Sequence, residues 1–241
     1  MIAAGTPGLG EQGALTLAAL AFSLGLQRIG RATRSEVYAT ASIVAGALGV
    51  AAIVFGQFVT ANPLFTGESV GRGAVFNLLL PGYLLPALMA GWVALAGKDV
   101  RPRFYTLMMG LLALALAFAY VTFAVRHGFH GERLDRPTVF DRENWSYSAA
   151  WLLFGIALLF AGLLFRQTML RAASGAVIAV VVLKVFLFDM SALTGVLRAA
   201  SFLGLGVVLI VIGRLYQRLL AGSAPPPPQS PPEADQPIST T

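Results

Sequence analysis

Three ionisable side chains lie close together near the C-terminal end of the apolar sequence. Lys184 lies inside a charge-free apolar run, Asp189 lies at its end, and Arg198 falls in the first turn of the next run. A charge near the centre of a membrane helix costs about 2.5–3.5 kcal/mol on insertion scales, and less near the interface. We therefore consider two hypotheses: a salt-bridge clamp between two helices, and an outward-facing pocket for a lipid headgroup or small acid.

The long charged segment 126–144 supplies further candidates. Arg126 is its first residue, and Asp141 and Glu143 lie near its end, just before Trp145. Glu143 can add an anion to the cluster around Lys184, but carboxylates in long charged loops are usually solvated, so we expect these two to be exposed. Acid–base catalysis on a lipid-linked substrate is the alternative.

His127 and His130, three residues apart in the same segment, are the two histidines of the chain. In the enzymatic alternative, His127 would act with Glu143 or Asp141. With no third ligand nearby, we predict no metal site, and we assign neither a catalytic residue nor a cofactor.

A third candidate is the apolar run 74–96, which contains Asn77, Pro81-Gly82 and Pro86. Proline removes a helical hydrogen bond and clashes with the preceding turn, so this helix should kink or break. Interrupted spans can mark binding sites in transporters, and they also occur as plain kinks. Asn77 and Pro86 therefore join the candidate binding residues.

The elements that must position these residues are membrane helices. Apolar residues make up 57% of the 241 positions and charged residues only 12%, whereas a soluble domain has about 25% charged residues. The net charge of +6 resides mostly in short loops, which is typical of membrane topology, so we expect a lipid bilayer and no nucleic acid as partner. There is no cysteine, and hence no disulfide or thiolate chemistry.

We predict an all-α polytopic transmembrane bundle of about seven spans over residues 1–220. Residues 221–241, which are rich in proline, should form a disordered cytoplasmic tail. Small residues four apart, as in Ser42/Gly46, should let a neighbouring helix approach closely. The first apolar run is barely long enough to span. The expected runs are 13–27, 37–60, 74–96, 104–125, 145–165, 172–188 and 199–215.

The charge of the loops predicts the orientation of the chain in the membrane. The loops after the first, third and fifth runs, together with the end of the seventh, lie on one side of the membrane and hold ten basic residues. The loops on the opposite side hold six, and four of these six share one loop with four carboxylates. The positive-inside rule then places the N-terminus outside and the C-terminus in the cytoplasm.

Several motifs, in order, resemble one bacterial family of predicted multi-pass membrane proteins, domain of unknown function 2339. They are Asn62-Pro63-Leu64, Phe76-Asn77-Leu78-Leu79, Tyr83-Leu84-Leu85-Pro86, Arg126-His127-Gly128-Phe129-His130-Gly131, Glu143-Asn144-Trp145-Ser146-Tyr147-Ser148 and Lys184-Val185-Phe186-Leu187-Phe188-Asp189. The resemblance covers about residues 13–220 and corresponds to the C-terminal portion of longer members. It implies residence in the bacterial inner membrane and a shared architecture, and it brings no catalytic assignment.

We therefore expect an envelope-related or transport-like membrane module with an outward-facing polar site for a small or lipid-linked anion. Its candidate binding residues are Lys184, Asp189, Arg198, Glu143, Arg126, Asn77 and Pro86. A membrane enzyme and a structural partner of other membrane subunits are the alternatives.

Overall fold

The computed structural model describes residues 8–98, 101–189 and 196–221, which form helices joined by turns and loops. The elements are α1 (Leu9–Thr33), α2 (Glu36–Ala51), η1 (Ala52–Thr60), α3 (Pro63–Thr66), η2 (Leu80–Leu84), α4 (Leu85–Gly97), α5 (Arg103–His130), α6 (Asp141–Leu164), α7 (Thr168–Lys184), η3 (Val185–Asp189) and α8 (Val196–Ala221). The segments η1, η2 and η3 are π-helical and continue or precede the neighbouring α-helices.

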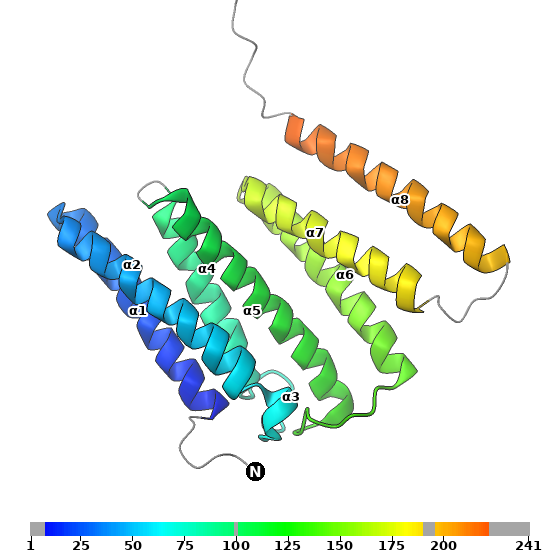
Figure 1. The fold of residues 1–241 in the computed structure, drawn as a ribbon, viewed down its shortest axis with the longest axis horizontal. Coiled ribbons are helices and arrows are strands. Elements are labelled where there is room, and N and C mark those ends of the chain that lie inside the picture. Colours follow the sequence, from blue (N-terminus) through cyan, green and yellow to red (C-terminus); the bar gives the residue numbers. More distant parts are fainter. Residues whose placement is uncertain (1–7, 99–100, 190–195, 222–241) are drawn as a thin grey trace, which may run out of the picture.

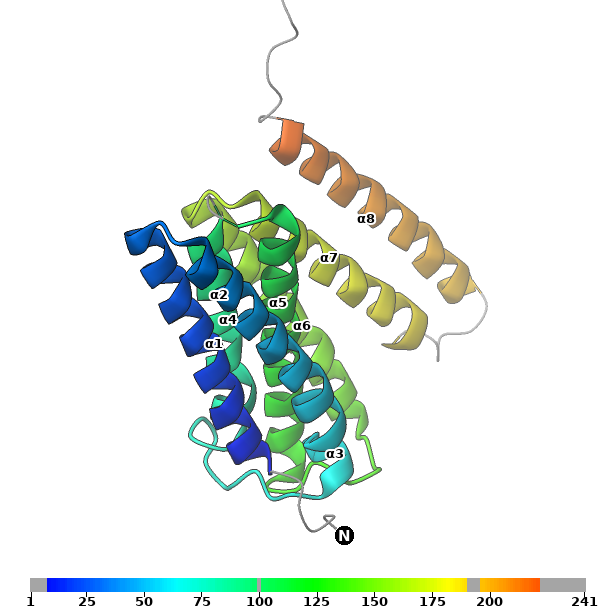
Figure 2. The same cartoon turned by 60° about the vertical axis from the view of Figure 1, so that its left-hand side comes forward.

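The long helices form three antiparallel pairs, α1 with α2, α4 with α5, and α6 with α7 (Figure 1). α8 lies beside α7, away from the first two pairs, and this placement is also visible after rotation (Figure 2). α3 and the α5–α6 loop lie at one end of the bundle, which we call the α3 end. The opposite end carries Arg31, Arg34, Arg101 and Arg103, and we call it the basic end.

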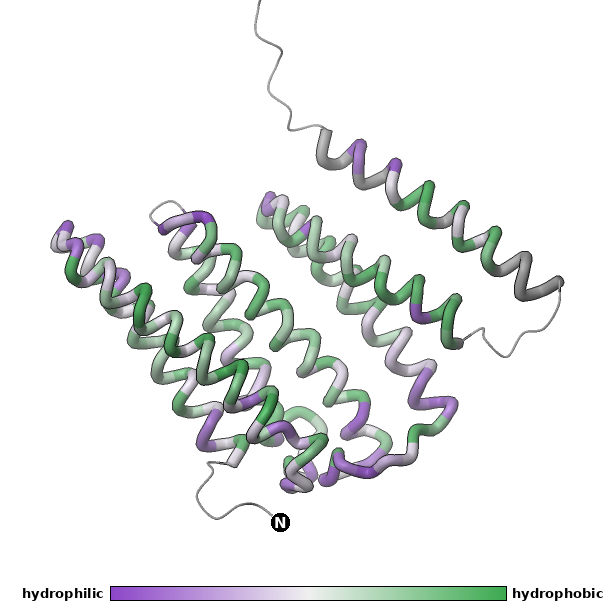
Figure 3. The backbone as a smooth tube through the Cα atoms, viewed as in Figure 1, coloured by the Kyte–Doolittle hydropathy of each residue, from purple (hydrophilic) through white to green (hydrophobic). Residues whose placement is uncertain are grey.

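The predicted all-helical membrane bundle is confirmed. Among the described residues, six helical segments are long and apolar enough to cross a bilayer, and α8 contributes the shorter apolar segment Phe202–Arg214. Apolar residues dominate the middle of the helices and polar residues gather at their ends (Figure 3). The first span is longer than its apolar run, because α1 extends over both flanks to Leu9–Thr33.

The third span is shorter than predicted. We expected it to begin at residue 74, but residues 74–78 form bends and a turn, and the first helical element of the span is η2, which begins at Leu80. Pro81 follows Leu80 directly, in the first turn, where a proline lacks only an amide that has no helical partner. The break therefore lies before the membrane segment, with the wide turn of η2 between it and α4.

The core lies between the first two helix pairs. Its largest fully buried members include Tyr83, Leu20, Ile53, Met109 and Leu116. Many large apolar side chains are instead exposed on the outside of the bundle, among them Phe22, Leu48, Phe55, Leu153 and Phe160. In a bilayer these side chains face lipid, which explains why the chain is too apolar for its own core.

Glycines allow the close approach of helices in this core. A Cβ atom added at Gly13 of α1 would lie 2.9 Å from the carbonyl carbon of Pro81 and 3.1 Å from the Cα atom of Gly82. A Cβ atom at Gly46 would lie 2.9 Å from the Cε atom of Met109. Ser42 and Gly46 are both buried, so the predicted small-residue contact face of α2 is confirmed.

The variant Gly13→Ala should destabilise the protein by about 1–3 kcal/mol, because the methyl group meets backbone atoms that cannot rotate away. Gly25→Ala in the same helix is the matched control, since nothing lies within 4 Å of its added Cβ atom. Alanine there should leave the melting temperature in detergent unchanged or raise it. Equal melting temperatures for the two variants would contradict the close packing of α1 against η2.

Candidate functional site

The most enclosed ionisable group at the α3 end is the carboxylate of Glu143. It lies in the first turn of α6 and is 0% exposed. Its Oε1 atom accepts hydrogen bonds from the Tyr147 hydroxyl at 2.7 Å and from Arg126 Nη1 at 3.2 Å. Its Oε2 atom lies 2.9 Å from His130 Nε2 and 3.4 Å from the amide nitrogen of Phe140. Both oxygens are therefore occupied, and the carboxylate joins α5 to α6.

Arg126 provides the cation of this group and also holds the α5–α6 loop. Its Nε atom donates to the carbonyl oxygen of Leu134 at 2.6 Å, and its Nη2 atom donates to the carbonyl oxygen of Arg136. The guanidinium thus binds one carboxylate and two loop carbonyls, a geometry that the fixed fork of arginine favours. We call Glu143, Arg126, His130 and Tyr147 the carboxylate clamp.

The expected exposure of Glu143 was wrong, although Asp141 in the same turn is exposed. α5 continues to His130 and α6 begins at Asp141, so the connecting loop is only 131–140 and most of the candidate groups lie on helices. Carboxylates in a first turn and basic groups in a last turn both interact favourably with the helix dipole. The segment that resembled a long solvated loop therefore consists of two helix ends joined by the loop 131–140.

Lys184 of α7 bonds the same first turns of α6. Its ammonium group donates to the carbonyl oxygen of Asn144 at 3.1 Å and to Ser148 Oγ at 2.8 Å. It also lies 5.9 Å from the ring centroid of Trp151, within the range of a cation–π contact. The structure thus brings three predicted residues together, because Arg126 bonds Glu143 and Lys184 bonds residues close to it in the first turns of α6.

The other members of the predicted cluster are not tested by these contacts. The backbone of Asp189 ends η3 and Arg198 lies in the first turns of α8, but both side chains lie outside the described residues. Whether Lys184, Asp189 and Arg198 form one cluster therefore stays a prediction.

Asn77 and Pro86 make contacts apart from the carboxylate clamp. Asn77 stabilises its own loop, since its side chain accepts from the amide of Leu79 at 3.0 Å and donates to the carbonyl of Gly73 at 2.9 Å. Pro86 is buried in the first turn of α4. Both residues have a structural explanation in the interrupted third span.

The interrupted span instead contributes to a row of buried hydrogen bonds between α1, η1 and η2, which the sequence analysis missed. Gln57 Nε2 of η1 donates to the carbonyl oxygen of Gly82 at 2.6 Å and to Thr16 Oγ1 at 3.2 Å, and the Tyr83 hydroxyl donates to the carbonyl of Gln57 at 3.0 Å. Gln12 Nε2 donates to the carbonyl of Ala52 at 2.8 Å. These side chains bond backbone carbonyls of η1 and η2, and Gln57, a lone glutamine within an apolar run, was the available signal.

His127 and Glu143, the pair of the enzymatic hypothesis, do not contact each other. His127 Nε2 is 2.8 Å from the carbonyl oxygen of Gly71, so it joins α5 to the loop before η2. An exposed ion pair between Arg72 and Glu132 joins the same loops, and the hydrogen bond from Arg72 holds the pKa of Glu132 below its ordinary value. Within the described ranges, no group of three or more His, Asp or Glu side chains is arranged to hold a metal ion.

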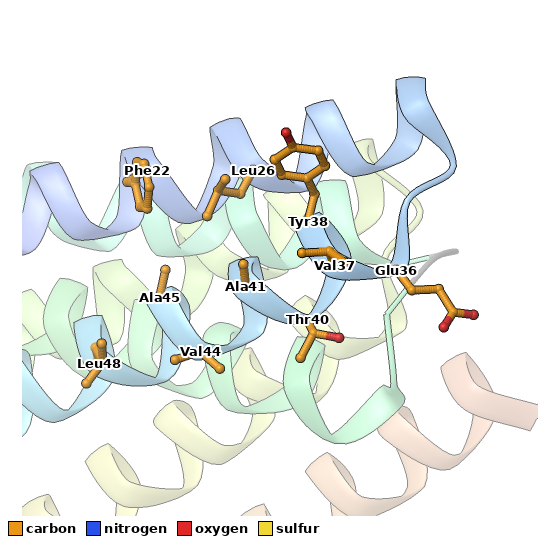
Figure 4. Close-up of a pocket in the computed structure, with 10 residues that line it drawn as sticks. All are labelled: Phe22, Leu26, Glu36, Val37, Tyr38, Thr40, Ala41, Val44, Ala45 and Leu48. Atoms are coloured by element: carbon orange, nitrogen blue, oxygen red, sulfur yellow. The ribbon is translucent and has the colours of Figure 1, made fainter.

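An open groove on α1 and α2 offers no comparable chemistry. Its lining is mostly apolar, with Glu36, Tyr38 and Thr40 as polar members (Figure 4). The remaining lining residues are Phe22, Leu26, Val37, Ala41, Val44, Ala45 and Leu48. The candidate polar groups therefore lie at the helix ends.

Replacing Glu143 by alanine should lower the free energy of unfolding by about 3–5 kcal/mol, because Arg126 and His130 lose a buried anionic partner. Asp141→Ala, in the same helical turn but exposed, should change it by less than about 0.5 kcal/mol. Thermal unfolding in detergent measures both. A stable Glu143→Ala variant would contradict the structural role of the clamp.

Comparison with known proteins agrees with the architecture. No curated protein and no solved structure matches the chain significantly. The family model described as predicted membrane protein (DUF2339) matches residues 2–219, which is nearly the whole helical region. This protein is therefore a membrane protein of the DUF2339 family.

Proposed function

We propose that this protein is a membrane module that binds an anion, either a lipid headgroup or a small acid, at the α3 end of its bundle. The observation that carries the proposal is the pair of cations, Arg126 and Lys184, which both bond to the first turns of α6, within or beside segments long enough to span a bilayer. Ionisable groups at such positions are rare and mostly functional.

Charge balance supports an anionic ligand. The five charged candidates are Arg126, Lys184 and Arg198, which are cationic, and Glu143 and Asp189, which are anionic, so the set carries one excess positive charge. Glu143 already binds Arg126 and His130. An anion at the rim would balance the excess charge.

The carboxylate clamp and Lys184 have different roles in this proposal. The carboxylate clamp holds the start of α6 against α5, and this fixes the backbone and hydroxyl oxygens that position Lys184. In this proposal Lys184 contacts the anion and Trp151 supports its ammonium group from the ring face. The Trp151 ring is itself held by a hydrogen bond of 3.1 Å from Nε1 to Thr122 Oγ1.

Loop charge supports an outer location for this site. The short turns at the basic end are rich in arginine, which is typical of cytoplasmic loops, so the α3 end would face away from the cytoplasm. The anion would then be a headgroup of the outer leaflet or a solute outside the membrane. Cysteine labelling of a residue such as Arg133 from the outside tests this orientation.

The variant Lys184→Leu should weaken retention of phosphatidylglycerol about fivefold, which corresponds to about 1 kcal/mol for one basic residue near a membrane surface. Native mass spectrometry of the purified protein with added phosphatidylglycerol or phosphatidylcholine measures retention. Lys98→Leu is the matched control, since Lys98 is exposed at the opposite end of the bundle.

A purely structural role for Lys184 predicts a different outcome. The variant would then unfold at a lower temperature while it retained as much anionic lipid as the Lys98→Leu control. That result would reject the binding proposal and favour a structural subunit.

A further inference from the structure

Arg101 is buried at the basic end, far from the carboxylate clamp. It is 9% exposed, and its Nη1 atom donates to the carbonyl oxygen of Ala39 at 2.7 Å while its Nη2 atom donates to Ser42 Oγ. Its Nε atom is buried without a hydrogen-bond partner. Among the described residues, no carboxylate forms an ion pair with Arg101. A buried guanidinium normally has an anionic partner, because removal of a lone charge from water is costly.

The serine hydroxyl groups around Arg101 already donate their hydrogens to backbone carbonyl oxygens. Ser42 Oγ donates to the carbonyl of Ala39 at 3.0 Å, and Ser23 Oγ donates to the carbonyl of Ser42 at 2.7 Å. The Tyr105 hydroxyl, 3.2 Å from Ser23 Oγ, must then act as the donor of that pair. Arg101 therefore contacts only neutral oxygens within this network, and its positive charge is not balanced there.

Gln27 is a second incomplete group on the same side of the bundle. It is 2% exposed, and neither its amide nitrogen nor its amide oxygen has a partner. Ser23, Gln27 and Gly30 lie on one stripe of α1, because residues four and seven apart share a helix face. Ser23 bonds Ser42, and a Cβ atom at Gly30 would lie 3.2 Å from the nitrogen of Ala39. Gln27 therefore faces the segment 39–42, where Arg101 also binds.

The electrostatic environment favours a negative ligand. Burial lowers the pKa of Arg101 from its ordinary value, the phenol of Tyr105 opposes this shift, and the positive charge of Arg31 adds to it. Arg31 is exposed, and its Nη2 atom donates to the carbonyl of Ala96 at 2.6 Å. Two guanidinium groups therefore raise the positive potential where α1, α2 and the α4–α5 connection meet.

We propose that Arg101 and Gln27 form a second anion site, which binds a phosphate group at the basic end of the bundle. Arginine binds phosphate oxygens through its N–H donors, and the Nε atom of Arg101, which has no partner, is one donor left for the ligand. The Gln27 amide nitrogen supplies a further donor. The phosphate belongs to a lipid headgroup or is free in solution. This site shares no residue with the carboxylate clamp, so its failure would leave the function proposed above unaffected.

The test compares thermal unfolding of the delipidated full chain in sodium chloride and in sodium phosphate at equal ionic strength. Saturating phosphate should raise the melting temperature of the wild type by about 5 °C. Arg101→Gln and Gln27→Leu should each abolish this rise. Arg103→Gln, which removes an exposed arginine two residues away, should retain it.

A parallel measurement with phosphatidylglycerol and phosphatidylcholine in mixed micelles identifies the source of the phosphate. A rise with phosphatidylglycerol alone, lost in Gln27→Leu, supports a lipid headgroup, whereas a rise with inorganic phosphate supports a free anion. If Arg101→Gln yields no folded protein, the response of the Gln27→Leu variant to phosphate decides whether the site exists. A wild type that responds to neither ligand, or a Gln27→Leu variant that keeps the full response, overturns the proposal.

Discussion

A carboxylate buried at the end of a membrane helix must be paired, and the pairing of Glu143 organises the α3 end of this protein. Arg126, His130, Tyr147 and the amide of Phe140 surround its two oxygens, and these groups come from α5, from the loop end and from α6 itself. Because the same arginine bonds two loop carbonyls, the helix pair and its loop form one unit. Lys184 then adds α7 to this unit through Asn144 and Ser148.

The other half of the bundle depends on small residues and neutral hydrogen bonds. Gly13 and Gly46 let α1 and α2 approach η2 and α5, and this closeness brings Gln12 and Gln57 within reach of backbone carbonyls of neighbouring segments. The π-helical segments η1 and η2 carry i→i+5 backbone hydrogen bonds in place of the α-helical pattern. Side-chain donors from neighbouring helices add bonds to their carbonyls, where the bilayer offers no water. The interrupted third span is therefore stabilised by neighbours from two other helices.

The two ends of the bundle differ in how their charges are balanced. At the α3 end, cations and carboxylates alternate and both oxygens of Glu143 are bonded, so a ligand would meet a preorganised rim. At the basic end, Arg101 and Gln27 are enclosed with donors left over, so a ligand would complete the site. A clamp of paired charges adds rigidity, whereas an incomplete buried group indicates a missing partner.

Length and apolar composition by themselves determined that this is an all-helical membrane protein, and the position of most spans, because insertion into lipid depends on local hydrophobicity. The alternation of spans likewise places Arg126, Glu143 and Lys184 at one end, because they lie near the ends of runs that cross the bilayer in turn. Only the tertiary structure decided that Glu143 is buried, that Asn77 and Pro86 contact other groups, and that Gln27 and Arg101 face one segment of α2. The partner of a polar group depends on the rotation and spacing of helices, which distant contacts such as Gly13 against Pro81 determine.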